Sequence, residues 1–409
     1  MDYVIIGNSA AAVGCVEGIR KGDPQGKITL VSDEPHFTYS RPLISYLLLG
    51  RTDEQRMKYR SEDFYEKNKV EALLGRRALS IDPNKKQVAL DDGSALSYDK
   101  LLVATGSRPF IPPAKGMEQI EHKVTFMSLD DAHALEAAID SNSRVLIIGA
   151  GLIGLKCAEG IARRVGKITV VDLAARVLPS ILDEEGAALV QRHIEEQGIE
   201  FILGDCVEEY TARSARLRSG RELDFDVVVI AAGVRPNTEL ISECGGEVER
   251  GICIDAHCQT TLPDVYAAGD CTLSYDITSG QERILALLPN AYLQGECAGI
   301  CMAGGESRYD NAIPMNAIGF FGLHMMTAGS PAQVAYSETG DKVYKKLYVS
   351  DGLLKGFILI GKVERAGIYT ALIRQQTPLD TLDFDLIAKN PQLMAFSRER
   401  RGQMLGGAL

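Results

Sequence analysis

Two glycine-containing turns, about 140 residues apart, contain the residues most able to do chemistry in this chain. Each turn follows a short apolar run rich in β-branched residues and precedes a helical pattern. Glycine there lets the backbone bend tightly and approach a pyrophosphate, whose charge then rests on the amides of the following helix. A chain needs two such sites mainly when electrons pass between two dinucleotides, as between a nicotinamide and a flavin. The residues are Gly7, Asn8, Ser9, Ala10 and Ala11 in the first turn and Gly149, Gly151, Leu152, Ile153 and Gly154 in the second.

Acidic residues follow the second strand of each predicted β-α-β unit, where a carboxylate can bind the ribose of a dinucleotide. Asp33 and Glu34 come about 26 residues after Gly7, and an ordinary acidic loop is the competing interpretation. Asp172 comes about twenty residues after Gly151. A carboxylate there favours NADH, because it would repel the extra phosphate of NADPH.

The apolar runs around these turns predict the elements that position them. A strand, a helix and a strand are expected within residues 1–35, and a second such unit within residues 144–172. A third apolar run is typical of a buried parallel strand that closes the second unit. The expected strands are 3–6, 27–31, 167–171 and 227–230, and the expected helices are 10–21 and 290–302.

The C-terminal part of the chain has a different pattern. Residues 313–376 are expected to form strands with polar turns, including 344–349 and 357–360, and then a helix. Residues 377–409 show little periodicity, so a frayed terminus is expected. The competing interpretation is a docking segment for a larger assembly. Its apolar residues would be Leu393, Met394 and Phe396, and its basic residues Arg398, Arg400 and Arg401.

Length and composition indicate an α/β protein of several domains. A chain of 409 residues is too long for one compact core, and its 40 glycines fit many tight turns. No apolar run approaches the roughly 18 to 20 residues of a membrane span. Met1-Asp2-Tyr3 leads directly into the first strand and leaves no room for a signal peptide, so we expect a cytoplasmic protein.

The net charge of −11 argues against nucleic acid as a principal partner. Two basic clusters interrupt this acidic background. Either cluster is a candidate for docking a small, acidic iron–sulfur carrier, although an ordinary solvated face is the favoured interpretation. The clusters are Arg51, Arg56, Lys58 and Arg60, and Lys342, Lys345 and Lys346.

Nine cysteines, an odd number without framework spacing, suggest reduced thiols rather than structural disulfides. Cys253 and Cys258 have the spacing of a redox pair, but they lie in a strand-and-turn pattern away from either glycine turn. Cys297 and Cys301 are one helical turn apart, without further cysteines nearby in sequence. We therefore expect no metal site or iron–sulfur cluster in this chain.

Five motifs in a fixed order give the chain a family resemblance. It resembles the FAD/NAD(P)-binding pyridine-nucleotide disulfide oxidoreductase superfamily. Three further segments are similar to the branch of rubredoxin reductases, NADH oxidases and nitrite reductase flavoproteins. The five motifs are Gly7-x-Ser9-x-x-Ala12, Ala104-Thr105-Gly106, residues 149–154, Ala232-Gly233-x-Arg235-Pro236-Asn237, and Thr261-x-Pro263 through Gly269-Asp270. The branch segments are residues 39–42, 316–322 and 364–369.

The resemblance implies an α/β fold with two Rossmann-like dinucleotide-binding domains and a smaller α+β C-terminal domain. The FAD-binding domain would be discontinuous, and the C-terminal domain is a dimer contact in relatives, which suggests a homodimer. The implied boundaries are 1–112 and 237–310 for the FAD-binding domain, 113–236 for the NAD-binding domain, 311–376 for the C-terminal interface domain and 377–409 for the tail.

The resemblance also assigns cofactor contacts. FAD would bind the first turn, with its ribose near Asp33 or Glu34, and the helix after residue 290 would point its positive N-terminus at the flavin. NADH would bind the second turn, with Asp172 on its ribose. The other implied cofactor contacts are Arg41, Ala78, Ala104, Thr105, Gly106, Gly233, Asp270, Asn290 and Ala291.

The chain departs from the family pattern in three ways. Ser9 replaces the middle glycine of the FAD turn, and no cysteine occurs between Cys15 and Cys157, so a catalytic thiol near the flavin is missing. Tyr46 and Lys156 stand where many relatives have a lysine and a glutamate. We expect a rebuilt catalytic acid–base pair at these two positions, with an exposed helix lysine as the competing interpretation.

Without a thiol, the implied mechanism is direct hydride transfer from NADH to FAD, followed by release of single electrons. The expected partner is a rubredoxin, a ferredoxin or another iron–sulfur subunit of a larger redox complex. An NADH oxidase that reduces dioxygen is the first alternative. A non-catalytic subunit with a structural flavin is the second.

Overall fold

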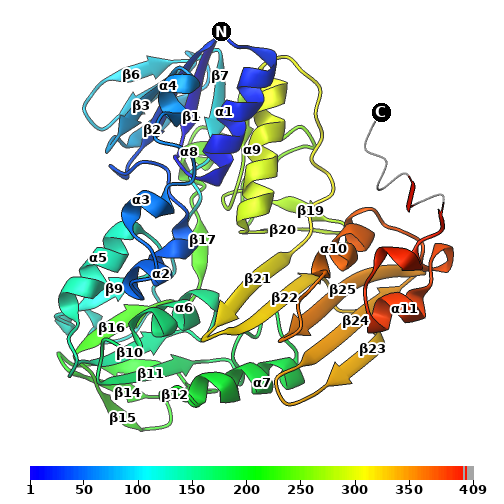
Figure 1. Cartoon of the computed structure of the whole chain (residues 1–409). Coiled ribbons are helices and arrows are strands. Elements are labelled where there is room, and N and C mark those ends of the chain that lie inside the picture. Colours follow the sequence, from blue (N-terminus) through cyan, green and yellow to red (C-terminus); the bar gives the residue numbers. More distant parts are fainter. Residues whose placement is uncertain (399–400, 403–409) are drawn as a thin grey trace. The chain divides into compact units, whose positions relative to one another are not determined.

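The computed structural model describes residues 1–398 and 401–402 (Figure 1). Contacts divide the chain into two compact units. Unit 1 comprises Met1–Leu178, Glu195–Ser274 and Glu282–Asp310. Unit 2 comprises Pro179–Ile194, Tyr275–Gln281 and the chain from Asn311 onward. Both glycine turns lie in unit 1.

The first sheet of unit 1 has five parallel strands in the order β18-β7-β1-β2-β3. Side chains alternate between its faces, so Tyr3 and Ile5 pack against two helices while Val4 and Ile6 pack against a small antiparallel sheet. The strands are β1 (Asp2–Ile6), β2 (Lys27–Ser32), β3 (Val70–Leu74), β7 (Lys100–Val103) and β18 (Val265–Ala267). The covering elements are α1 (Ala10–Gly22), α9 (Leu288–Met302), β4 (Ala78–Asp82), β5 (Gln87–Leu90) and β6 (Ala95–Ser97).

Helices α1 and α9 lie side by side, in blue and yellow in Figure 1, and glycines make their close approach possible. A Cβ atom on Gly295 would lie 1.9 Å from the carbonyl oxygen of Ala11, and one on Gly14 would lie 2.2 Å from that of Tyr292. These glycines hold α9, which is distant in sequence, against the helix that follows the first turn.

The second sheet of unit 1 repeats this arrangement, with the parallel order β12-β11-β10-β16-β9. Its strands are β9 (Lys123–Thr125), β10 (Arg144–Ile148), β11 (Lys167–Asp172), β12 (Ile199–Leu203) and β16 (Val227–Ile230). The antiparallel strands β13 (Val207–Tyr210), β14 (Ser214–Leu217) and β15 (Glu222–Asp224) contribute to the core on one face. Strand β16 is fully buried as expected, but β9 rather than β16 forms the edge of this sheet.

Short elements connect the two halves of unit 1. β8 (Ser107–Pro109) pairs with β17 (Val234–Pro236) in antiparallel register. Helix α2 (Ile44–Leu48) packs on α6 (Leu152–Ile161) and on α5 (Leu129–Ala138). The remaining helices of unit 1 are α3 (Glu54–Met57), α4 (Phe64–Lys67) and α8 (Glu239–Ser242).

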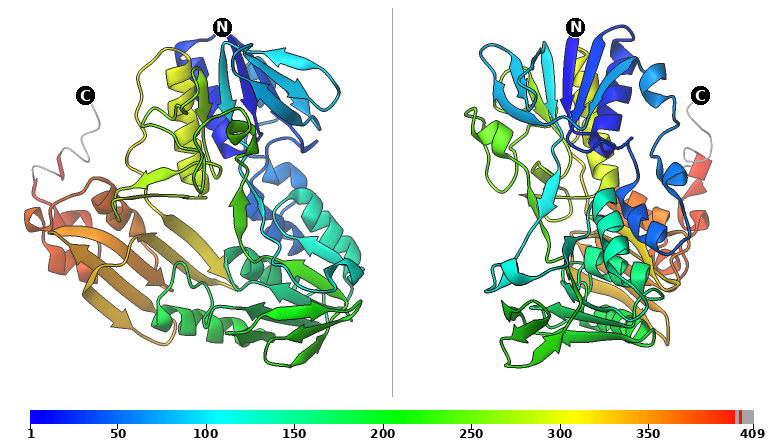
Figure 2. Two further views of the ribbon diagram at one scale, coloured as in Figure 1. Left: turned by 180° about the vertical axis from the view of Figure 1, so that it is seen from behind. Right: turned by 90° about the vertical axis from the view of Figure 1, so that its left-hand side faces the viewer.

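Unit 2 is built on one antiparallel sheet in the order β21-β22-β25-β24-β23. Asp183, which precedes α7 (Glu184–Glu195), accepts hydrogen bonds from Tyr344 at 2.6 Å and from Lys346 at 2.7 Å. The strands are β21 (Met315–Phe320), β22 (Leu323–Gly329), β23 (Gln333–Thr339), β24 (Tyr344–Ser350) and β25 (Leu353–Ile360), and the later helices are α10 (Ala366–Arg374) and α11 (Phe384–Lys389). Figure 2 gives two further views of these elements.

The segment after residue 376 differs from the expected frayed terminus. Its α11 helix packs into the core of unit 2, where Ile387 and Phe396 are buried and Leu393 is packed against them. Of the apolar residues considered for docking, only Met394 is largely exposed. The docking interpretation therefore loses two of its three apolar residues, and Arg400 lies outside the described residues. Within the part of the chain that the structure describes, no helix has the length and apolar character needed to cross a bilayer.

Candidate functional site

The first glycine has the same geometry in both turns. Gly7 has φ +117° and Gly149 has φ +118°, a region that L side chains rarely adopt. A Cβ on Gly7 would lie 2.2 Å from the carbonyl oxygen of Ala104, and one on Gly149 would lie 2.2 Å from that of Ala231. Each glycine therefore lets its turn pack directly on the neighbouring parallel strand.

The other two glycines of the second turn have different roles, one in packing and one in leaving open space. A Cβ on Gly154 would lie 2.0 Å from the carbonyl oxygen of Gly149, so this residue is required for close packing of α6 on the turn. Around Gly151, no heavy atom lies within 4 Å of the Cβ position, which leaves room for a ligand. Leu152 and Ile153, which start α6, are partly exposed beside this space. In the first turn Ser9 takes the place of Gly151, and Ala10 and Ala11 are buried.

Three helices that start at the expected cofactor positions lack side-chain caps. Neither Ser9 before α1, Gly151 before α6 nor Leu287 before α9 makes a side-chain hydrogen bond to the first turn. By contrast, Ser128 caps α5 with a complete capping box. Uncapped helix amides are suited to bind the phosphates or the anionic ring of a cofactor.

Glu34, one of the two acids after β2, is bound within the protein. Arg41 forms an ion pair with Glu34, and the Tyr39 hydroxyl donates to the same carboxylate at 2.7 Å. Burial lowers the pKa of Arg41, but Tyr39 and Glu34 outweigh this effect and the net shift is upward. Asp33 is exposed. Among the described residues, none forms an ion pair or hydrogen bond with the Asp33 carboxylate. Asp33 is therefore more available than Glu34 to bind a ribose.

Asn8 has a structural role in the first turn. Its side-chain amide donates to the carbonyl of His36 at 3.1 Å, and its oxygen accepts from Thr38 at 2.5 Å and from Tyr65 at 2.9 Å. These bonds tie the turn to the loop that contains Glu34 and Arg41.

The Ala104–Gly106 turn is joined to Asn237. The Thr105 hydroxyl donates to the Asn237 carbonyl at 2.7 Å, and the Asn237 side chain returns a bond to the Thr105 carbonyl at 2.9 Å. Gly106 has φ +63° and open space at its Cβ position. The turn is therefore rigidly held while one side of it stays open.

Asp270 lies next to this turn. Ser107 Oγ donates to its carboxylate at 3.4 Å, and burial raises its pKa although Ser107 and Arg41 lower it. The preceding Gly269 donates its amide to Gln294 of α9 at 2.8 Å. Gln294, which the sequence did not single out, thus fixes Asp270 relative to the start of α9, where Asn290 and Ala291 are buried.

Asp172 supports the second turn directly. Its Oδ2 accepts a hydrogen bond from the Ala150 amide at 2.6 Å, and its Oδ1 accepts from the Ala174 amide at 2.7 Å. Gly233, after β16, has φ +108° and open space at its Cβ position. Ala78 begins β4 and pairs with Leu90.

The two expected catalytic positions lie in contact. Lys156 Nζ is 4.4 Å from the centroid of the Tyr46 ring, and it forms an ion pair with Glu159 one helical turn away. Lys156 is 9% exposed and Glu159 is 4% exposed. The interpretation of Lys156 as an exposed helix lysine is therefore wrong. The sequence missed Glu159, although its i+3 spacing from Lys156 is a recognisable signal.

The contact that Cys258 makes is not the one that the sequence spacing suggests. All nine are free thiols, and Cys258 contacts Cys297 rather than pairing with Cys253. The hydrogen bond from Cys258 is the largest cause that lowers the pKa of Cys297 to about 6. Cys297 follows Asn290 by seven residues, about 10 Å along α9. Within the described residues, no group of three or more His, Cys, Asp or Glu side chains is arranged to hold a metal ion.

Two parallel sheets, each with a glycine turn that leads into an uncapped helix, define a protein that binds two dinucleotides and exchanges electrons between them. Residues 1–295 match the pyridine nucleotide-disulphide oxidoreductase family, and the chain belongs to this family. It is an FAD- and NAD(H)-dependent oxidoreductase, and its turn glycines and uncapped helices fit these cofactors.

Several characterised proteins are similar in sequence. The epsilon subunit of NADH-dependent phenylglyoxylate dehydrogenase from Aromatoleum evansii is 32% identical over 98% of this chain and 97% of that protein. Rubredoxin-NAD(+) reductase from Pseudomonas putida is 30% identical over 74% of this chain and 80% of that protein. An NADH oxidase from Methanocaldococcus jannaschii is 31% identical over 76% of this chain and 71% of that protein. The chain spans about half the length of the similar nitrate and nitrite reductase subunits, with 49% and 45% of those proteins covered.

Solved structures show the same fold. Putidaredoxin reductase, in its covalent complex with putidaredoxin, superimposes with a TM-score of 0.88 and 23% identity over 100% of this chain and 99% of that chain. The NAD-dependent persulfide reductase from A. fulgidus gives a TM-score of 0.86 with 27% identity, over 94% of this chain and 79% of that chain.

Proposed function

We propose that this chain transfers hydride from NADH to FAD and passes the electrons singly to an iron–sulfur or rubredoxin-type protein. The observation that carries the proposal is the pair of glycine turns in one unit, each leading into an uncapped helix. Per NADH, two oxidised carriers would each gain one electron, while NAD⁺ and one proton are released. FAD supplies the exchange between two-electron and one-electron steps when it is bound.

The residues divide between the two cofactors. The α1 amides after Ser9 would bind the FAD pyrophosphate, with Arg41 and the Thr105 turn beside it and Asp270 on the ribityl chain. The α9 amides near Asn290 would stabilise negative charge on the reduced ring. On the other side, the α6 amides after Gly151 would bind the NADH pyrophosphate. Because Glu34 is held by Arg41 and Tyr39, we assign the FAD ribose to Asp33.

Lys156 and Tyr46 would act as positioning residues for hydride transfer. Lys156 belongs to the helix of the NADH turn, and Tyr46 belongs to the helix that follows Arg41. Their contact would join the two cofactor sites, with Glu159 fixing the ammonium group. The proposed hydride transfer needs no thiol, and Cys297, which contacts Cys258, lies about 10 Å along α9 from Asn290.

Anaerobic stopped-flow spectroscopy tests this function. We expect the FAD-loaded protein to lose its absorbance near 450 nm when it is mixed with NADH, and to recover it when an oxidised rubredoxin is added. Rapid recovery with air alone would favour the NADH oxidase alternative, for which the M. jannaschii relative is the supporting observation. A flavin that NADH does not bleach would leave the non-catalytic subunit as the remaining function.

The similarity to a dehydrogenase epsilon subunit supports a place in a larger redox complex. We keep the cytoplasm as the proposed location, which the nine free thiols support. A homodimer through residues 311–376 and the domain boundaries at 112, 236 and 310 also remain part of the proposal. Size-exclusion chromatography with light scattering would test the dimer.

A further inference from the structure

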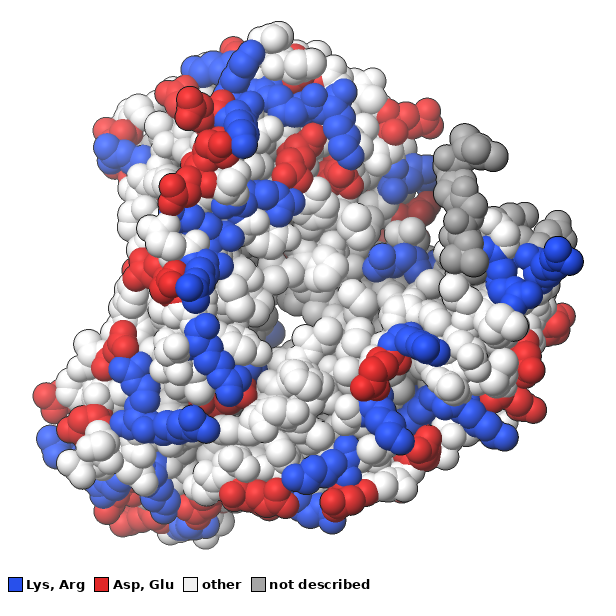
Figure 3. Space-filling model, in the orientation of Figure 1, with Lys and Arg blue, Asp and Glu red and all other residues white. Residues whose placement is uncertain are grey.

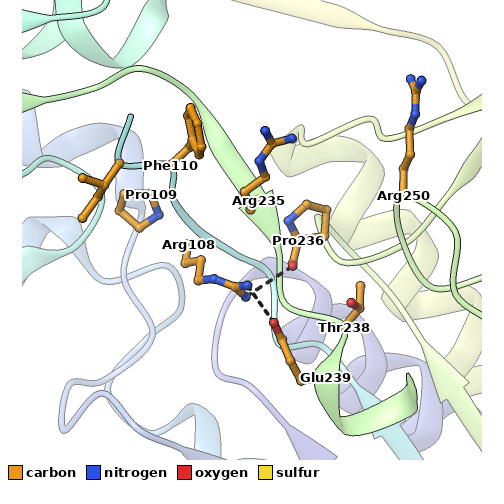
Figure 4. A pocket seen from close by; sticks show the side chains of 9 residues that line it. Arg108, Pro109, Phe110, Arg235, Pro236, Thr238, Glu239 and Arg250 are labelled. Atoms are coloured by element: carbon orange, nitrogen blue, oxygen red, sulfur yellow. Dashed lines mark hydrogen bonds and ion pairs between the residues drawn. The ribbon is translucent and has the colours of Figure 1, made fainter. Parts of the chain in front are cut away.

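A hollow of about 660 Å³ opens beside the paired strands β8 and β17 of unit 1 (Figure 4). No candidate cofactor contact lies in it. Its lining residues are Arg108, Pro109, Phe110, Ile111, Arg235, Pro236, Thr238, Glu239 and Arg250.

The hollow holds more positive than negative charge. Three arginines and one glutamate line it, so its formal charge is +2 in a chain with net charge −11. Arg108 is neutralised, because its guanidinium lies 2.7 Å from the Glu239 carboxylate and 2.8 Å from Asn237 Oδ1. Within the described residues, no carboxylate forms an ion pair with Arg235 or Arg250. Figure 4 shows both of these side chains pointing away from Glu239.

The basic clusters considered from the sequence are, by contrast, largely neutralised. Arg60 binds Glu17 at 2.7 Å, Lys58 binds Glu62 at 2.5 Å, and Lys346 binds Asp183 at 2.7 Å. On the face drawn in Figure 3, many of the basic side chains lie beside acidic ones. Neither sequence cluster therefore offers a concentrated positive charge to an acidic partner.

Apolar surface lies among the free guanidinium groups. Ile111 is 47% exposed, and Phe110 packs its ring under the Arg235 guanidinium at 4.6 Å. Arginine and aromatic residues are enriched at protein interfaces, whereas small-molecule sites enclose most of their ligand. The hollow is broadly open and its arginines are exposed, so it suits a protein surface better than a small anion.

The hollow is also connected to the proposed FAD site. Strand β8, which forms one wall, follows directly after the Ala104–Gly106 turn. Its first residue, Ser107, donates a hydrogen bond to Asp270. A protein docked at Arg108 and Phe110 would thus lie one short strand away from the residues assigned to the flavin.

We propose that the Arg235–Arg250 hollow is the docking surface for the acidic face of a small iron–sulfur electron carrier. This inference rests on the proposed function and names where its acceptor binds. Transient electron-transfer interfaces are small, below about 1,200 Å². Charge attraction at such an interface mainly raises the association rate, and salt weakens it.

The test compares two electron acceptors at several ionic strengths. An acidic rubredoxin is the protein acceptor and dichlorophenolindophenol is the small one, with NADH as donor. The variant is Arg235→Gln/Arg250→Gln. The control is Arg51→Gln/Arg77→Gln, which removes two exposed arginines elsewhere in unit 1. We expect the variant to lower kcat/KM for rubredoxin about tenfold at low salt, with a flatter salt dependence. Dye reduction by the variant should stay within about twofold of the rate of the parent protein. The control should stay within about twofold of the parent protein with both acceptors.

The outcomes separate this inference from the proposed function. A variant with unchanged kcat/KM and salt dependence for rubredoxin would overturn the docking surface and leave the proposed function intact. A parent protein that reduces the dye but no rubredoxin would overturn the proposed acceptor, and the docking surface with it. Saturable binding of inorganic pyrophosphate, lost in the variant, would mark a small-anion site and overturn protein docking.

Discussion

The ammonium group of Lys156 lies 4.4 Å from the ring centroid of Tyr46, although 110 residues separate them in sequence. Tyr46 comes from the helix after Arg41, and Lys156 comes from the helix of the second glycine turn. Glu159 completes the group and balances the buried positive charge. The cluster therefore fixes the two proposed cofactor sites relative to each other.

Replacing Lys156 should separate its contribution to stability from its contribution to hydride transfer. Lys156→Met leaves Glu159 buried without this partner, and breaking a buried pair costs about 3–5 kcal/mol, so thermal unfolding should shift downward. Lys156→Met/Glu159→Gln should recover most of that stability. If the cluster positions the cofactors, the double variant should still reduce its flavin about tenfold more slowly with NADH.

Tyr46→Phe is the matched control for these variants. It keeps the ring that Lys156 contacts and removes only the hydroxyl, so stability and rate should change little. A double variant with the parent rate of flavin reduction in stopped flow would leave Lys156 as a packing ion pair only.

Asp172→Ala should alter the choice between NADH and NADPH. The carboxylate holds the Ala150 amide at 2.6 Å and is assigned to the NADH ribose, so its loss removes bonds to a charged group. Such bonds contribute about 1.5–3 kcal/mol, so kcat/KM for NADH should fall roughly 10- to 100-fold. The value for NADPH should fall less, because repulsion of its phosphate is also removed. An unchanged NADH/NADPH ratio, with a lower unfolding temperature, would restrict Asp172 to support of the turn.

Arg41→Ala should weaken FAD retention. The guanidinium lies beside Glu34 and Tyr39 and lowers the pKa of Asp270, so it is central to the proposed FAD site. We expect a dissociation constant for FAD at least about tenfold higher, measured by fluorescence of the released flavin. Arg41→Lys keeps the positive charge but loses the forked contact of the guanidinium. Its dissociation constant for FAD should therefore lie between those of the parent protein and of Arg41→Ala. A stable, fully yellow Arg41→Ala protein would remove Arg41 from the site.

The sequence predicted the parts of this fold that depend on local patterns. Strand β1 and helix α1 begin within one residue of the expected positions, because an apolar run and a glycine turn define them locally. Strand β25 begins four residues earlier than expected, and β9 was missed because three residues with one exposed member give no periodicity. The family and its cofactors were predicted correctly from five motifs in order.

Pairings across long sequence distances were not predictable in this way. No local sequence pattern indicates that Arg41 forms an ion pair with Glu34 or that Gln294 accepts a hydrogen bond from Gly269. The same is true of the contact between Cys258 and Cys297. The contacts of Gln294 and Cys297 depend on how α9 packs against α1, which in turn depends on glycines such as Gly295. In the sequence, such a glycine cannot be distinguished from any other helix residue, because its role depends on the neighbouring helix that it contacts.

Asp270→Asn should stabilise the FAD-free protein at neutral pH while weakening its affinity for FAD. Burial raises the pKa of Asp270 above 3.8, more than Ser107 and Arg41 lower it. A carboxyl group whose pKa is raised by folding binds its proton more tightly in the folded chain. Its contribution to stability is therefore fully present below pH 3.8 and is lost as the pH rises through the raised pKa.

Asparagine stays neutral at every pH, so the Asp270→Asn variant does not lose this stability when the pH rises. Without FAD at pH 7, the variant should unfold about 2 °C higher or more than the parent, and the difference should disappear toward pH 4. With FAD, the variant should lose about tenfold in affinity, because the ribityl hydroxyls lose a charged acceptor. Calorimetry across pH, with and without FAD, measures both effects. An unfolding temperature lowered equally at pH 5 and pH 8 would show that Asp270 contributes through a hydrogen bond rather than through its buried charge.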